Sequence, residues 1–163
     1  MTIDVGQKIP NVELFILEDG GPKAVSTDAL FGGKRVALFG VPGAFTRTCS
    51  AKHLPGFVQH ADALKAAGID EVMCLSTNDV FVLDAWGRAH DADGKVVMVS
   101  DGLLSFTRAA GLEVMLRDNG FGQRCRRFST IVDNGVVASF HTEKPGEFGE
   151  TSAETLLGGL SGA

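Results

Sequence analysis

Apolar runs and turn-forming residues follow each other along the first half of the chain, and this pattern predicts strands separated by helices. Asn11 to Leu17 and Arg35 to Gly40 are predicted strands. The second is an almost continuous apolar run, which is typical of a strand buried on both faces of a sheet. From about Thr46 to Ala67, apolar residues recur at helical spacing and stop at Gly68. A long helix is therefore expected directly after the buried strand.

The middle of the chain repeats the strand-helix order. Glu71 to Ser76 and Lys95 to Val99 are predicted strands, and between them Asn78-Asp79 offers a cap for a helix that runs to about His90. The order up to this point is β-α-β-α-β.

The last third of the chain predicts a hairpin followed by a helix. The predicted strands Arg127 to Asp133 and Val136 to His141 flank Asn134-Gly135, which is the strongest short signal for a hairpin turn. Thr151 or Ser152 can cap a last helix that runs through Leu160. This part of the chain is therefore β-β-α.

A parallel βαβ half joined to an antiparallel ββα half predicts an α/β fold of the thioredoxin-like kind, with helices on both faces of a mixed central sheet. Ligand sites in such sheets lie beyond the carboxyl ends of the strands, where the first strand-to-helix loop meets its helix. That loop contains Cys49.

Composition narrows the class of protein. The 163 residues, 44% of them hydrophobic, suit one domain spanning 1–163. A net charge of −5 disfavours nucleic acid and anionic lipid as partners. The longest uncharged apolar stretch, Val36 to Phe45, is too short to cross a membrane. With no visible secretory signal and an odd number of cysteines, three, a reducing, cytoplasmic location is expected.

The candidate chemistry is concentrated between Pro42 and Ser50. Cys49 falls in the first turn of the predicted helix, where unpaired N–H groups and the helix dipole stabilise a thiolate. Thr46 can bring its hydroxyl to the same sulfur, and Pro42, which lacks an N–H, can shield the sulfur from water. The alternative is a buried structural cysteine. The position at a strand-loop-helix junction favours a nucleophile.

These residues resemble a known family. Pro42-Gly43-Ala44-Phe45-Thr46 followed by Cys49-Ser50 and His53-Leu54-Pro55-Gly56-Phe57 is similar to the active-site signature of the peroxiredoxins, specifically the type-5 subfamily that includes the plant type II enzymes. Further similar segments are Cys74-Leu75-Ser76, Asn78-Asp79, Trp86-Gly87-Arg88-Ala89-His90 and Arg127-Phe128-Ser129.

The resemblance implies reduction of hydrogen peroxide and alkyl hydroperoxides by a peroxidatic cysteine, Cys49, supported by Pro42, Thr46 and Arg127. The thiolate would attack a peroxide oxygen in line and become a sulfenic acid, with no metal, flavin or haem cofactor. Arg127 would stabilise the leaving oxygen. One departure is local, because relatives usually carry Pro and then Gly or Thr where this chain has Arg47-Thr48.

Other residues near the motif have competing interpretations. The alternation of Arg124, Arg126 and Arg127 requires only Arg127 to point at the site, a choice that rests on the resemblance. His53 lies one helical turn after Cys49, so it is either a base or, as we expect, a partner in a structural hydrogen bond. The remaining histidines lack metal-ligand spacing, and no metal site is expected.

The other two cysteines bear on how the sulfenic acid is reduced. Cys74 lies in an apolar strand and is expected to be structural. Cys125 is expected in a loop between two arginines that favour its thiolate, so a regulatory role stays open. Thr151-Ser152 stands where some relatives have a resolving cysteine. The resemblance therefore implies an external reductant, either glutathione with glutaredoxin or thioredoxin.

Two further functions and one assembly complete the expectations. A redox sensor or holdase on the same fold would use Cys49 without turnover, and an acyl hydrolase would need a Cys-His pair with an orienting acid or amide that the sequence does not offer. Phe45, Trp86 and Phe121 are expected at the rim of the site. Relatives commonly pair across their active-site loops, which implies a homodimer whose interface borders the Cys49 loop.

Overall fold

The fold is a mixed seven-stranded sheet with helices on both faces, in a computed structural model that describes residues 2–144 and 147–161. The strand order is β2-β1-β5-β4-β3-β8-β9. Strands β3, β4 and β5 are mutually parallel, and the other pairings are antiparallel. The strands of this sheet are β1 (Glu13–Glu18), β2 (Gly21–Ser26), β3 (Arg35–Gly40), β4 (Glu71–Ser76), β5 (Val97–Ser100), β8 (Phe128–Asp133) and β9 (Val136–Thr142).

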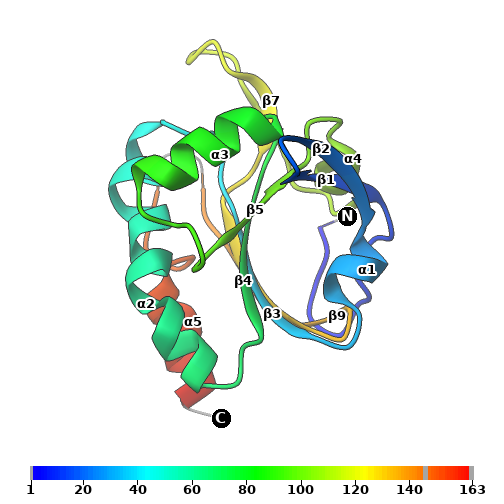
Figure 1. Cartoon of the computed structure of the whole chain (residues 1–163), viewed down its shortest axis with the longest axis vertical. Coiled ribbons are helices and arrows are strands. Elements are labelled where there is room, and N and C mark those ends of the chain that lie inside the picture. The colour runs from blue at the N-terminus through cyan, green and yellow to red at the C-terminus, as the bar shows by residue number, and fades with distance from the viewer. Residues whose placement is uncertain (1, 145–146, 162–163) are drawn as a thin grey trace.

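Two hydrophobic layers lie on the two faces of this sheet. Successive residues of β3 alternate between them, so that Val36 and Leu38 belong to one layer and Ala37 and Phe39 to the other. Helices α2, α3 and α5 cover one face and the short helices α1 and α4 the other (Figure 1). The helices are α1 (Thr27–Phe31), the π-helix η1 (Cys49–His53), α2 (Leu54–Ala66), α3 (Val80–Ala89), α4 (Ser105–Ala109) and α5 (Ala153–Ser161). The predicted thioredoxin-like class is confirmed.

A separate two-stranded sheet joins β6 (Glu113–Leu116) to β7 (Gly122–Cys125). In Figure 1 this β6–β7 hairpin, found by the label β7, projects from the top end of the molecule. Together with β2, α1 and α4, it is an element that the sequence pattern did not predict.

The long helix predicted from Thr46 to Ala67 differs from the observed one at its start. The N–H of Leu54 donates to the Cys49 carbonyl, an i to i+5 bond, so the chain makes a π-helical turn before α2 begins. Pro55 gives a physical reason, because a proline has no N–H to donate to the carbonyl four residues earlier. The regular α-helix therefore starts only at Leu54.

The predicted hairpin and caps are present. Asn134 and Gly135 both have positive φ angles, 48° and 80°, as a two-residue type I′ turn requires. Asp79 caps α3, and the Ser152 hydroxyl accepts the N–H of Thr155 at the start of α5. The predicted strand from Lys95 to Val99 is observed slightly later, as β5.

The sheet register brings the ends of two strands together at one edge. Gly40, the last residue of β3, pairs with Phe128, the first residue of β8. The Cys49 loop leaves β3 at this point, and Arg127 immediately precedes β8. Residues far apart in the sequence therefore meet beyond the carboxyl end of β3, as the fold class predicts for a ligand site.

Candidate active site

Cys49 is a fully buried free thiol at the start of the helical segment. The N–H of Ser50 donates to the Thr46 carbonyl at 3.0 Å, so the first helical turn includes Cys49. The predicted place of the cysteine in a first turn is therefore observed. Backbone N–H groups at such a position stabilise negative charge on the sulfur.

Arg127 contacts the sulfur directly. Its Nη2 donates to Cys49 Sγ at 3.1 Å, although the two residues are 78 positions apart in the chain. The guanidinium is half-buried and always charged, and a hydrogen bond from a charged donor is stronger than one from a neutral donor. Arg127 therefore points at Cys49, as its place in the shared motif implies.

His53 links Arg127 to the segment before α5. Its Nδ1 lies 2.7 Å from Arg127 Nη1 and its Nε2 lies 2.9 Å from the Thr151 carbonyl. Because an arginine can only donate, Nδ1 is the acceptor and the ring proton is on Nε2. Burial, together with the charge of Arg127, lowers the pKa of His53 from 6.5 to about 3. The ring is therefore neutral, and the lone pair of Nδ1 accepts a hydrogen bond from Arg127. The structural hydrogen bond that was expected for His53 is present.

The π-helix explains why His53 and Cys49 share one arginine. A turn closed by an i to i+5 bond holds more residues than an α-helical turn, so residues four apart are rotated around the axis in the opposite sense to that in an α-helix. From regular helical spacing, His53 is expected to project toward the next turn and away from the sulfur. In the structure both side chains face Arg127 instead.

Thr46 does not have the contact that was expected of it. Its hydroxyl donates to the Gly43 carbonyl at 2.7 Å. Since a hydroxyl has a single proton, the Cys49 sulfur receives none from Thr46 in this arrangement. The oxygen lone pairs of Thr46 remain as acceptors. Pro42 is half-buried and lines a cavity that also contains Thr48 and Arg127.

Two side chains that were not assigned to the site from the sequence hold the same loop. Arg124 Nη1 donates to the Pro42 carbonyl at 3.1 Å. The Oδ1 of Asn78 accepts the N–H of Ala44 at 2.8 Å and the hydroxyl of Ser76 at 2.7 Å. Of the three arginines, Arg127 donates to the Cys49 sulfur, and Arg124 donates from β7 to the loop, a contact that the sequence did not predict. For Asn78, the only sequence signal was its place in a motif shared with relatives.

Cys74 and Cys125 are both fully buried in strands. Burial raises the pKa of Cys74 well above its usual value, and burial raises the pKa of Cys125 to about 12. Cys74 packs as a structural residue, as expected. Cys125 ends β7 and is not in a loop, and its burial outweighs the flanking arginines, so the activation expected from them is not observed.

Trp86 is not at the rim. It is fully buried, and its Nε1 donates to the Ser50 hydroxyl at 2.9 Å, one residue from Cys49. The ring is buried because it lies on the face of α3 that packs on the sheet, whereas the sequence pattern suggested an element end. Phe121 is half-buried beneath the Arg124 guanidinium. Of the three rim aromatics, only Phe45 is exposed, at 57%.

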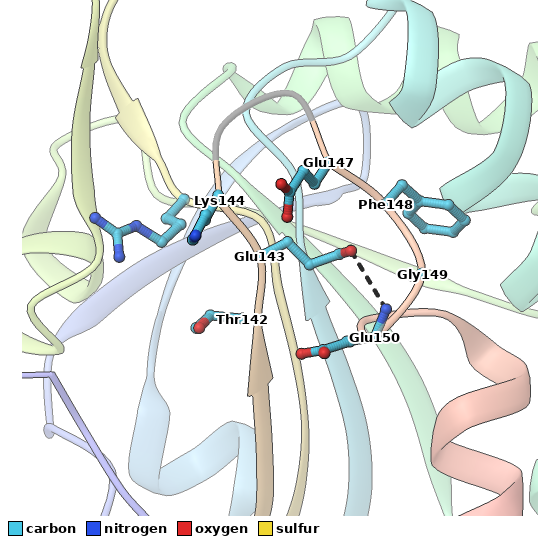
Figure 2. Close-up of a pocket in the computed structure, with 8 residues that line it drawn as sticks. Thr142, Glu143, Lys144, Glu147, Phe148, Gly149 and Glu150 are labelled. Carbon is cyan, nitrogen blue, oxygen red and sulfur yellow. Dashed lines mark hydrogen bonds between the residues drawn. The ribbon is translucent and has the colours of Figure 1, made fainter.

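Two adjoining cavities share Arg126 and Glu143 in their walls, near the Cys49 loop. The smaller one has apolar walls from Val114 and Leu116 and is also lined by Arg127, which contacts the Cys49 sulfur. The larger one is polar and lies around the segment that precedes α5, where Glu143 accepts the N–H of Glu150 (Figure 2). Glu143 also accepts the hydroxyl of Thr151. Of the two, the smaller cavity is the candidate site, because it is lined by Arg127, which donates to the buried Cys49 sulfur.

Neither a metal centre nor a membrane span is found in the described part of the chain. Residues 2–144 and 147–161 contain no group of three or more His, Cys, Asp or Glu side chains that could hold a metal ion. No helix within these ranges is long and apolar enough to cross a membrane.

Comparisons with known proteins agree with the geometry. The Redoxin family model matches residues 4–157. Peroxiredoxin-2D of Arabidopsis thaliana is 45% identical over 159 residues, which are 97% of this chain and 98% of that protein. Peroxiredoxin-2E, chloroplastic, of the same plant is 44% identical over 98% of this chain and 70% of its own length. The reduced Prx3 of Vibrio vulnificus in complex with hydrogen peroxide has a TM-score of 0.93 and 45% identity, covering 98% of this chain and 99% of its own.

The match spans nearly the whole chain, includes peroxiredoxin-2 proteins of a plant, and coincides with a buried cysteine that accepts a hydrogen bond from an arginine. The chain therefore belongs to the Redoxin family and is a peroxiredoxin of the type-5 subfamily, a thiol-dependent peroxidase.

Proposed function

We propose that Cys49 is the peroxidatic cysteine, which reduces hydrogen peroxide and alkyl hydroperoxides. The observation that carries this assignment is the 3.1 Å hydrogen bond from Arg127 Nη2 to Cys49 Sγ. The thiolate attacks the terminal oxygen of the hydroperoxide, so that an S–O bond forms as the O–O bond breaks. The electron pair of the broken bond goes to the leaving oxygen, which takes up a proton and departs as water or an alcohol. Cys49 becomes a sulfenic acid, oxidised by two electrons.

Arg127 serves both the sulfur and the peroxide in this proposal. The same guanidinium that donates to Sγ in the resting enzyme has further N–H groups that can donate to the peroxide oxygens as charge develops. His53 supports this role because its neutral Nδ1 accepts from Nη1 and fixes the orientation of the guanidinium.

Thr46 and Pro42 shape the space that the hydroperoxide occupies. With its proton committed to the Gly43 carbonyl, Thr46 Oγ1 is an acceptor, and the hydrogen of the hydroperoxide is the matching donor. Pro42 forms part of the cavity wall and offers no N–H to compete for the sulfur. The peroxide is thereby oriented with its terminal oxygen toward Cys49.

The reductant in this proposal comes from outside the chain. Cys74 and Cys125 are fully buried and their pKa values are raised, so neither is a ready partner for a sulfenic acid at Cys49. An external thiol would condense with the sulfenic acid, releasing water and forming a mixed disulfide, and a second thiol would then free Cys49. Glutathione with glutaredoxin and thioredoxin are the two candidates. Turnover assays with each reductant alone distinguish them.

The proposed assembly is a homodimer. Phe45, Phe81 and Leu103, here called the Phe45 patch, are 57%, 55% and 64% exposed. Phe81 and Leu103 line one shallow cavity, and Phe45 is near because the preceding Ala44 bonds the side chain of Asn78, three residues before Phe81. Exposed large apolar groups that lie near one another favour a covered interface. A second copy of the chain would provide it beside the Cys49 loop.

The proposed location is the cytoplasm. All three cysteines are free thiols and no disulfide joins any pair of them, which suits a reducing compartment. Subcellular fractionation with an antibody against the chain tests this location.

Cysteine variants test the proposed function. We expect Cys49→Ser to abolish consumption of hydrogen peroxide in the presence of a thiol reductant, because only its sulfur contacts Arg127. Cys74→Ser and Cys125→Ser, which remove buried thiols, serve as controls and should keep most of the activity. Turnover that survives in Cys49→Ser overturns the assignment. Oxidation of Cys49 without turnover supports the redox-sensor alternative instead.

A further inference from the structure

Arg124 is held rigidly between the β6–β7 hairpin and the loop that precedes Cys49. Its Nε donates to the carbonyl of Phe121 at 3.0 Å, and its guanidinium lies 5.3 Å from the centre of the Phe121 ring. Its Nη1 donates to the Pro42 carbonyl at 3.1 Å across 82 positions of sequence. A guanidinium with these three contacts is preorganised, because little side-chain freedom is left to lose.

The contact with Pro42 fixes one peptide plane of the loop. In a trans peptide the C=O and the following N–H point in opposite directions, so a Pro42 carbonyl turned toward Arg124 turns the N–H of Gly43 to the other side. Gly43 is buried, and within the described residues its N–H has no hydrogen-bond partner. There is little free space beside this peptide, since a Cβ on Gly43 would be 3.0 Å from Arg124 Nη1.

The next peptide of the loop, Gly43–Ala44, is tied independently at both of its polar groups. The Gly43 carbonyl accepts the Thr46 hydroxyl, and the Ala44 N–H donates to Asn78. The N–H of Val41, just before Pro42, donates to the Leu75 carbonyl at 3.0 Å, so the Pro42–Gly43 peptide lies between two tied peptides and is itself held by Arg124. Without it, the Pro42 carbonyl is free to rotate toward the Cys49 sulfur, where the negative end of a carbonyl dipole would repel a thiolate.

We propose that Arg124 is a positioning residue for the peroxidase reaction: by holding the Pro42 carbonyl away from Cys49, it keeps the loop in the form that admits and orients the hydroperoxide. The inference rests on the proposed role of Cys49. It gives the β6–β7 hairpin a function, because β7 carries Arg124 to the loop and the turn residue Phe121 braces it.

The test compares Arg124→Gln with Arg124→Lys and with a matched control, Arg117→Gln, which removes an exposed arginine of the same hairpin. The rate constant of Cys49 oxidation is measured in single turnover with hydrogen peroxide, using the fluorescence of Trp86, the single tryptophan, which lies next to the site. The rate constant for reduction of the sulfenic acid by a thiol is measured separately.

We expect Arg124→Gln to lower the rate constant of oxidation by about 10-fold to 100-fold, the range for a misplaced reacting group. The rate constant for reduction of the sulfenic acid by a thiol should be unchanged. A general loss of structure would change both rate constants. Arg124→Lys, which keeps a donor, should recover part of the loss, and Arg117→Gln should match the wild type. Unchanged oxidation in Arg124→Gln, or an equal loss in Arg117→Gln, overturns the inference.

A second variant, Gly43→Ala, tests the same contact if Arg124→Gln folds poorly, and a double-mutant cycle joins the two variants if both fold. Gly43→Ala crowds the same contact from the loop side, where its Cβ would meet both Arg124 Nη1 and Thr46 Cγ2. If the two act through one contact, their combined effect on the oxidation rate is smaller than the product of the separate effects. Independent effects overturn the inference. Loss of turnover in Cys49→Ser with normal oxidation in Arg124→Gln would leave the proposed function standing and remove only the positioning role.

Discussion

His53 connects Arg127, the partner of the Cys49 sulfur, to the segment before α5, because its two ring nitrogens contact Arg127 and Thr151. Thr151 in turn donates its hydroxyl to the buried carboxylate of Glu143. A continuous chain of hydrogen bonds therefore runs from the Cys49 sulfur to the polar cavity of Figure 2. Each member is satisfied, and removing one would leave a buried polar group unpaired.

The imidazole predicts how stability depends on pH. The pKa of His53 is lowered to about 3 in the folded state, against 6.5 for a free histidine, so below pH 6.5 the unfolded chain binds a proton that the folded chain does not. Stability from this group is therefore full above pH 6.5 and is lost as the pH falls toward 3. We expect the free energy of unfolding to fall with a slope of up to about 1.4 kcal/mol per pH unit from His53 alone.

Urea unfolding at a series of pH values between 4 and 7 measures this slope. His53→Asn, which keeps a neutral polar side chain, should remove the contribution, and His141→Asn, a half-buried histidine of β9, serves as the control. A slope that is identical in the wild type and in His53→Asn would contradict the proposed proton count.

At the scale of elements, the sequence pattern predicted those strands and helices whose signals are local. β3 and β4 have the expected bounds because both are almost continuous apolar runs. The turn between β8 and β9 follows from Asn134-Gly135 alone. The resemblance placed Cys49 and Arg127 in one site. What it could not place is the tie from Arg124 to Pro42, since that bond depends on a hairpin whose position is set by packing.

The elements that were missed share weak patterns. β2 pairs only with β1 at the sheet edge and exposes most of its side chains, so no apolar alternation marks it. Helices α1 and α4 have five residues each, too few for a helical period to be visible. The π-turn at Cys49 is a response to Pro55 and to packing around Arg127, and helical periodicity does not predict such a turn.

Two glycines test the packing between elements. Gly40 ends β3 against Phe128, and a Cβ at Gly40 would overlap that buried ring, which is itself stacked between Phe106 and Phe140. We expect Gly40→Ala to lower the free energy of unfolding by about 1–3 kcal/mol, the usual cost of overpacking a core.

Gly56 is the matched control for this substitution. It lies in the first turns of α2, and no neighbouring side chain comes within 4 Å of the position that a Cβ would take. Gly56→Ala should therefore be neutral or stabilise by up to about 1 kcal/mol through helix propensity. Chemical denaturation of both variants measures the difference. If the two variants are equally stable, the packing between β3 and β8 adjusts to the extra methyl group.

At the scale of the whole molecule, the chemistry and the exposed apolar surface lie on neighbouring parts of one loop. The Cys49 loop presents Pro42 and Thr48 to the cavity and Phe45 to the outside, where Phe45 has a φ angle of 63°. A left-handed residue that is not glycine costs energy and persists only when its surroundings hold it. Cover from a second copy of the chain over the Phe45 patch would hold it while leaving the cavity open.

The proposed dimer can be tested through the Phe45 patch without disturbing the core. Trp86→Asp is unsuitable, because Trp86 is fully buried and a charge there would destabilise the fold. Phe81→Glu instead places a carboxylate on the exposed first turn of α3. Across a two-fold axis it would face its own copy or an apolar surface, and burying such charges is unfavourable by several kcal/mol. Sedimentation velocity should give twice the 17.1 kDa chain mass for the wild type and the single mass for Phe81→Glu.

Val5→Glu is the control, since Val5 is as exposed as Phe81, at 56%, but lies in the N-terminal segment away from the Phe45 patch. It should sediment as the wild type does. If the dimer braces the Cys49 loop, Phe81→Glu should also lower the rate constant of Cys49 oxidation, because Phe45 is then uncovered and the loop is less firmly held. A wild-type chain that stays monomeric at its highest concentration, or a dimer that Phe81→Glu leaves intact, would contradict this interface.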